Sequence, residues 1–140
     1  MPALALPSRM ALPESLLTDI HWSFSEPPPV TPLDLLEEAR QYAADIGAPD
    51  VTSMLGRALP VADLVVHCRY DVRNAQGVWV ESSRQHRVVS ASGPLTGADL
   101  LWEIHIAFAD AVGRGDKHYF EGLELMSIDG VPVYELVLGS

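Results

Sequence analysis

Two segments with helical periodicity, separated by runs in which apolar and polar residues alternate, restrict the fold of this chain more than any other feature. Thr31 can cap the first helical segment, which runs to Gly47. The second segment runs from Thr96 to about Val112 and ends before a glycine. Helices that alternate with strand patterns predict an α+β fold.

The strand patterns have a period of two, which is typical of half-buried strands. Four of them cover residues 61–73, 78–90, 118–128 and 131–138, and a short fifth lies at about 18–25 within a Pro-rich N-terminal segment, residues 1–30. Asp129–Gly130 suits a type I′ turn, which would place Glu124 opposite Glu135 and Met126 opposite Val133.

The element order is therefore β-α-β-β-α-β-β. It predicts a mostly antiparallel sheet with two helices on one face, ferredoxin-like (a split β-α-β unit) with an added C-terminal strand. A cystatin-like or roll arrangement is the alternative. Residues 81–87 contain no apolar side chain, so the middle of that strand is expected at a sheet edge or beyond the sheet.

Length and composition favour one globular domain, residues 1–140, with 48% hydrophobic residues and no apolar run long enough to span a bilayer. A net charge of −10 disfavours binding to nucleic acid or to anionic membranes and favours basic partners. A single cysteine, Cys68, fits a reducing cytoplasm. One lysine against eight arginines is typical of a GC-rich bacterial or phage genome.

Residues 61–90 are the one part of the chain in which basic residues outnumber acids. Arg69, Arg73, Arg84 and Arg87 lie there, with His67 and His86 nearby. They form either a cationic patch that binds a carboxylate or phosphate, or a solvated hairpin whose charges pair across the strands.

No motif for catalysis, cofactor or metal binding is present, so no catalytic residue, cofactor or metal ion is predicted. His21, His67 and His86 lie on three different predicted strands and could converge. His67 and Cys68 cannot ligate one ion from a regular strand, because neighbouring strand residues point to opposite faces. Cys68 is expected to be a buried small hydrophobic residue.

The second helical segment is apolar around most of its circumference. Trp102 and Ile106 form a second apolar line beside the face that would pack on the sheet, and His105 lies between them in sequence. Either the N-terminal segment or a second subunit should cover such a helix. These three residues are therefore candidates for partner contact.

Two functions fit the sequence. The first is a non-catalytic protein-binding module, such as a small acidic neutralising (immunity-like), adaptor or anti-defence protein, which binds another protein, itself as a homodimer, or both. The alternative is a small dimeric ferredoxin-like enzyme or ligand-binding protein, whose cavity between two sheets would be lined by His21, His67, Arg69 and Arg87.

Overall fold

A computed structural model describes residues 12–91 and 93–140 and confirms the α+β class. Part of the N-terminal segment, residues 1–11, lies outside the described residues. The helices and strands, in chain order, are β1 (Ser15–Leu16), β2 (Trp22–Ser23), α1 (Pro32–Asp45), α2 (Thr52–Gly56), β3 (Asp63–Arg73), β4 (Trp79–Val89), α3 (Gly97–Val112), β5 (Tyr119–Ser127) and β6 (Val133–Gly139).

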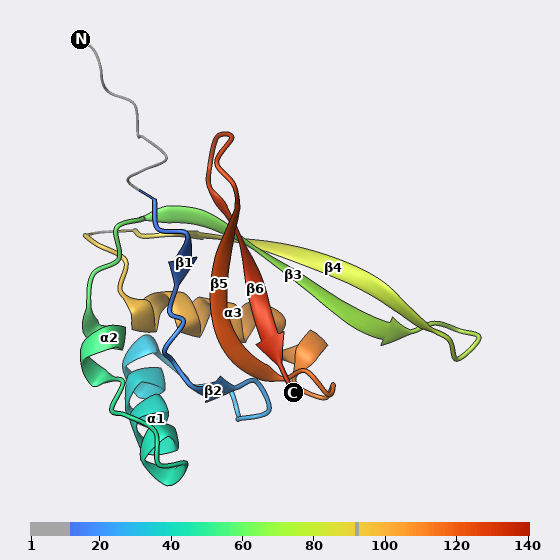
Figure 1. Ribbon diagram of the computed structural model, residues 1–140, viewed down its shortest axis with the longest axis horizontal. Coiled ribbons are helices and arrows are strands. Elements are labelled where there is room, and N and C mark those ends of the chain that lie inside the picture. Colours follow the sequence, from blue (N-terminus) through green and yellow to red (C-terminus); the bar gives the residue numbers. More distant parts are fainter. Residues whose placement is uncertain (1–11, 92) are drawn as a thin grey trace.

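The six strands form one mixed sheet (Figure 1) in the order β1-β5-β6-β3-β4, with β2 also paired to β5. All pairs are antiparallel except β3 with β6. The ferredoxin-like order is thus not confirmed. Of the strand expected at 18–25, only Trp22–Ser23 is a strand, at the margin of the sheet. The chain brings β3 rather than this strand beside β6.

The two long helices begin as the sequence predicts. The Thr31 hydroxyl accepts the backbone N–H of Asp34, and Thr96 and Asp99 form a reciprocal capping box. Helix α3 packs on β3 and β4, whereas α1 packs on α3, α2 and β2. Within the described residues, no helix combines the length and the apolar character needed to cross a bilayer.

The hairpin of β5 and β6 has the expected register at its centre, with Glu124 opposite Glu135. A bulge then places Ser127, rather than Met126, opposite Val133. The type I′ turn is wrong: Gly130 has a positive φ of 74°, but Asp129 does not. Because of the bulge and the longer connection, Met126 is left without the cross-strand partner that a two-residue turn would have given it.

The described part of the Pro-rich N-terminal segment, residues 12–30, crosses the sheet margin and then contacts α3. The hydroxyl of Tyr134 donates to the carbonyl of Pro13 at 2.8 Å, and β1 and β2 pair with β5. Further along, the indole N–H of Trp102 donates to the carbonyl of Pro29 at 2.9 Å. From its sequence, this helix is expected to be covered by either the N-terminal segment or a second subunit, and the N-terminal segment does contact it.

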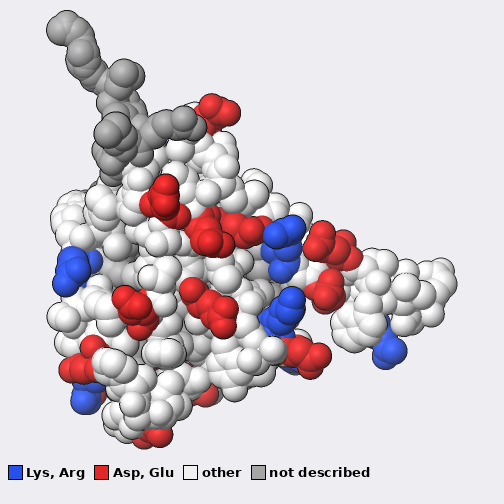
Figure 2. Space-filling model, viewed as in Figure 1, with Lys and Arg blue, Asp and Glu red and all other residues white. Residues whose placement is uncertain are grey.

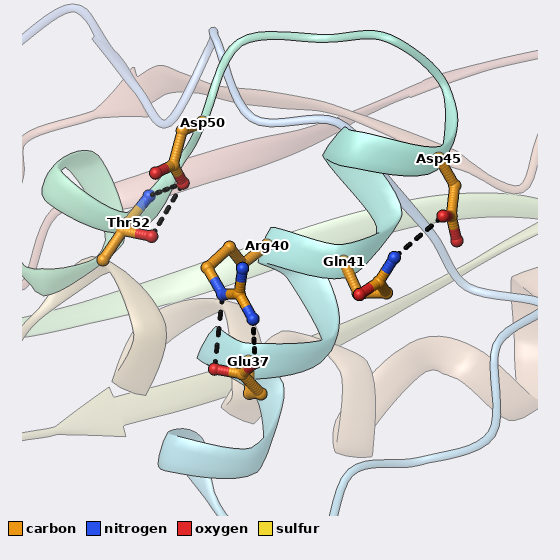
Figure 3. A network of polar contacts seen from close by, with 6 residues as sticks. All are labelled: Glu37, Arg40, Gln41, Asp45, Asp50 and Thr52. Atoms are coloured by element: carbon orange, nitrogen blue, oxygen red, sulfur yellow. Dashed lines mark hydrogen bonds and ion pairs between the residues drawn. The ribbon is translucent and has the colours of Figure 1, made fainter.

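Helices α1 and α2 carry exposed polar contacts on their outer side (Figure 3). Arg40 forms an ion pair with Glu37 one turn earlier, and the Gln41 amide donates to Asp45 at 2.8 Å. Asp50 accepts both the N–H and the hydroxyl of Thr52 at the start of α2. These contacts all lie within neighbouring turns, so they stabilise local structure rather than form a site.

Candidate functional site

The β3–β4 hairpin extends well beyond the rest of the sheet as an arm (Figure 1), here defined as residues 68–84. β3 and β6 pair over only three positions, the last joining His67 to Glu135. Beyond that pair the two strands diverge. A hollow of about 760 Å³, which we call the cleft, lies between the arm and the body.

Three parts of the chain line the cleft. They are the arm (Arg69, Tyr70, Asp71, Trp79, Glu81), the end of α3 with the loop after it (Ala111, Val112, Arg114, Gly115, Asp116, Lys117) and the body strands (Glu124, Glu135, Leu136, Val137, Leu138). Five of these residues are acidic and three are basic. Charges of both signs gather where the arm joins the body (Figure 2).

The carboxylates of the two cleft walls occur as like-charge pairs across adjacent strands. Asp71 lies opposite Glu81 on the arm, and Glu124 lies opposite Glu135 on the body. Like charges directly opposite each other destabilise a sheet. Arg69 relieves one pair, because its guanidinium Nε lies 2.7 Å from a Glu135 carboxylate oxygen.

The tip of the arm exposes large apolar side chains. Val72, Val78, Trp79 and Val80 are all exposed, with Trp79 at 62%. The turn that connects the strands is ordered by hydrogen bonds, because the Asn74 side chain accepts the backbone N–H groups of Gln76 and Val78. The apolar tip is therefore displayed by an ordered hairpin.

Arg84 and His86, two basic residues of the segment 61–90, attach β4 to α3 and do not line the cleft. Arg84 donates to the carbonyl of Ala107 at 2.7 Å and to Asp110 at 2.9 Å. His86 lies 2.9 Å from Glu103. The polar middle of β4 therefore packs against Glu103 and Asp110 of α3, and β4 is an edge strand.

The remaining candidates on the hairpin have partners within it. Arg87 makes a two-pronged ion pair with Asp63, at 2.9 and 2.6 Å. The imidazole of His67 lies 3.2 Å from the Gln85 amide. Of the basic residues predicted here, the structure places only Arg69 in the cleft.

The other candidates lie elsewhere. His21 is exposed beside β2, and β5 and β6 separate that strand from β3. Trp102 is half-buried beneath the N-terminal segment, while Ile106 is exposed on α3. Within residues 12–91 and 93–140, no group of histidine, cysteine or acidic side chains is placed to hold a metal ion.

His105 is fully buried, so it lies in the core rather than on a contact surface. Its Nδ1 accepts the indole N–H of Trp22 at 3.0 Å, and its ring contacts Phe24. Its Nε2 has no hydrogen-bond partner in the part of the chain that the structure describes. Burial lowers the pKa of His105, and this effect exceeds the opposing effect of the Glu26 backbone.

Cys68 lies in the core, as the apolar face of its strand predicts. Burial raises the pKa of its thiol to about 11, which outweighs the opposing effect of Arg84. The thiol is therefore protonated at neutral pH and is not a nucleophile.

Several residues that define this site belong to no recognisable motif, so the sequence did not predict their role. Val78 and Trp79 fall within a strand pattern that carries no sign of their exposure. The position of Asp71 opposite Glu81 depends on the register of the hairpin. The turn at residues 74–77 sets that register, so the turn was the sequence signal from which the pairing of Asp71 with Glu81 could have been predicted.

The cleft has unpaired strand edges, carboxylates and an apolar tip beside it. These features are the ones available for binding through backbone, charge and apolar contact. In comparisons with family models, curated proteins and solved structures, nothing matches this chain.

Proposed function

We propose that this chain is a non-catalytic protein-binding module that holds a basic partner protein between the arm and the body. The observation that carries the proposal is the arm itself. The ordered hairpin projects from the sheet and leaves Val78 and Trp79 more than half exposed, and exposed apolar side chains of this kind mark contact surfaces.

Charge supports the choice of partner. The chain has a net charge of −10, and acids outnumber bases in the cleft lining. Such a surface attracts a basic protein and speeds its association. An immunity-like, adaptor or anti-defence protein would act in this way, by covering a surface of its partner.

Two valines of almost equal exposure allow a matched test. Val78 is 55% exposed at the arm tip, and Val89 is 56% exposed at the opposite end of β4. Wild type, Val78→Glu and Val89→Glu would each be isolated with bound partners from the host cells and weighed by native mass spectrometry.

We expect wild type and Val89→Glu to carry the same basic polypeptide and Val78→Glu to lose it. Equal capture by all three variants would contradict the arm as the binding element. A dimer that carries only a small additional mass would instead favour the enzyme or ligand-binding alternative.

A further inference from the structure

The cleft separates two strand edges that lack a partner. After the last pair with β6, β3 continues through residues 68–73, and β6 continues through residues 136–139 beyond its last pair with β3. Among the described residues, no strand pairs with these edges on the side of the cleft. Free N–H and C=O groups on both sides of a gap can accept an added strand.

The two faces of the cleft differ in chemistry. Asp71 and Glu135 lie on the open face of the sheet, and Tyr70 and Leu138 lie on the face packed against the core. Side chains of a strand point alternately to opposite faces. A strand inserted in the cleft would therefore direct every second side chain toward carboxylates and the others toward Tyr70 and Leu138.

The carboxylates of the cleft are only partly neutralised. Arg69 pairs with Glu135, while Asp71, Glu81 and Glu124 form no ion pair within the described part of the chain. Lysine or arginine side chains from an added strand would neutralise them and remove the repulsion between the like-charge pairs.

We propose that the cleft binds an extended segment of the partner, as a strand added between β3 and β6, in which basic residues alternate with apolar ones. This proposal rests on the proposed function, because it assigns the part of the partner that enters the site. A second copy of this chain is a poorer occupant, since its own charge of −10 would be repelled.

A synthetic probe tests the proposal without the natural partner. The probe is a soluble seven-residue peptide in which lysine and valine alternate. Its control has the same composition, with the lysines and valines in separate blocks. Affinity is measured by fluorescence anisotropy, and protection of backbone amides by hydrogen–deuterium exchange on the full chain.

We expect the alternating peptide to bind at least ten-fold more tightly than the block peptide and to protect amides in residues 68–73 and 136–139. The double variant Asp71→Asn/Glu124→Gln should weaken binding by about ten-fold, which corresponds to two charge pairs. Asp19→Asn/Glu38→Gln removes the same charge outside the cleft lining and should bind as wild type.

Equal affinity for the two peptides, or protection confined to the outer edge of β4, would overturn the proposal. These results are separate from those of the partner capture. If Val78→Glu loses the natural partner but the cleft amides stay unprotected with the alternating peptide, the binding function stands and strand addition is wrong.

Discussion

At the scale of single residues, Trp22 and His105 join the N-terminal segment to the helices. The Trp22 ring packs edge-on against Tyr42 of α1, with ring centroids 6.0 Å apart, and its N–H is bound by His105 of α3. Because Nδ1 of His105 accepts this bond, the ring is neutral with its proton on Nε2. The period-two pattern around Trp22 predicted its burial, but no local pattern could identify a partner so distant in the sequence.

The buried histidine makes stability depend on pH. Its folded-state pKa lies below the ordinary value of 6.5, so the unfolded chain binds the proton more readily. The stabilisation from the neutral ring is complete above about pH 6.5 and is lost as the pH falls below it. Urea unfolding from about pH 8 to about pH 5 should show this decline.

His105→Gln should flatten that pH dependence, because glutamine can accept the Trp22 N–H but does not titrate. The exposed His21→Gln is the matched control and should follow wild type. An unchanged slope for His105→Gln would show that another group causes the decline.

Trp102 attaches the Pro-rich segment to α3 through one hydrogen bond. Trp102→Phe removes the bond to Pro29 and keeps an aromatic ring, so we expect a loss of about 1 kcal/mol in the free energy of unfolding. Trp79→Phe, at an exposed tryptophan, should change that free energy by only about 0.3 kcal/mol. If thermal unfolding shows equal losses for Trp102→Phe and Trp79→Phe, the hydrogen bond from Trp102 to Pro29 does not stabilise the fold as we expect.

At the scale of elements, the sequence predicts both long helices and the four long strands well, because capping residues, glycines and period-two patterns are local signals. The order of the strands was not predictable in the same way. Two of the six strands have only two residues each, and the parallel contact of β3 with β6 covers three pairs. Such short pairings depend on packing across the whole fold rather than on any local pattern.

The middle of β4 illustrates the same limit for the site. Its lack of apolar residues predicted a position at the sheet edge or beyond the sheet, and β4 is an edge strand. Its polar partners on α3 were not apparent from the strand alone. Arg84 and His86 meet Asp110 and Glu103, so two polar surfaces pack together beside the core.

Arg84 should therefore contribute more to stability than Arg87, which lies on the opposite face of β4. Arg84→Met removes bonds to a backbone carbonyl and to Asp110, and we expect a loss of about 1 kcal/mol. Arg87→Met breaks only the exposed ion pair with Asp63, so we expect it to lower the free energy of unfolding by about 0.5 kcal/mol. A larger loss for Arg87→Met in urea unfolding would contradict this assignment.

At the scale of the whole molecule, the fold divides into a packed body and an arm that projects from it. The body buries Trp22, His105 and Cys68, while the arm exposes apolar residues at its tip. The net charge of −10 is the reason that the proposed partner is basic. The arm and the cleft beside it are thus the surfaces through which we expect this chain to act.

The most direct measurement is hydrogen–deuterium exchange on the full chain, alone and in complex with the partner captured from its host. We predict slower exchange in residues 68–73, 78–81 and 136–139, and unchanged exchange along α1. Protection centred on the exposed side of α3 around Ile106, with the arm and cleft unaffected, would contradict the proposed binding site.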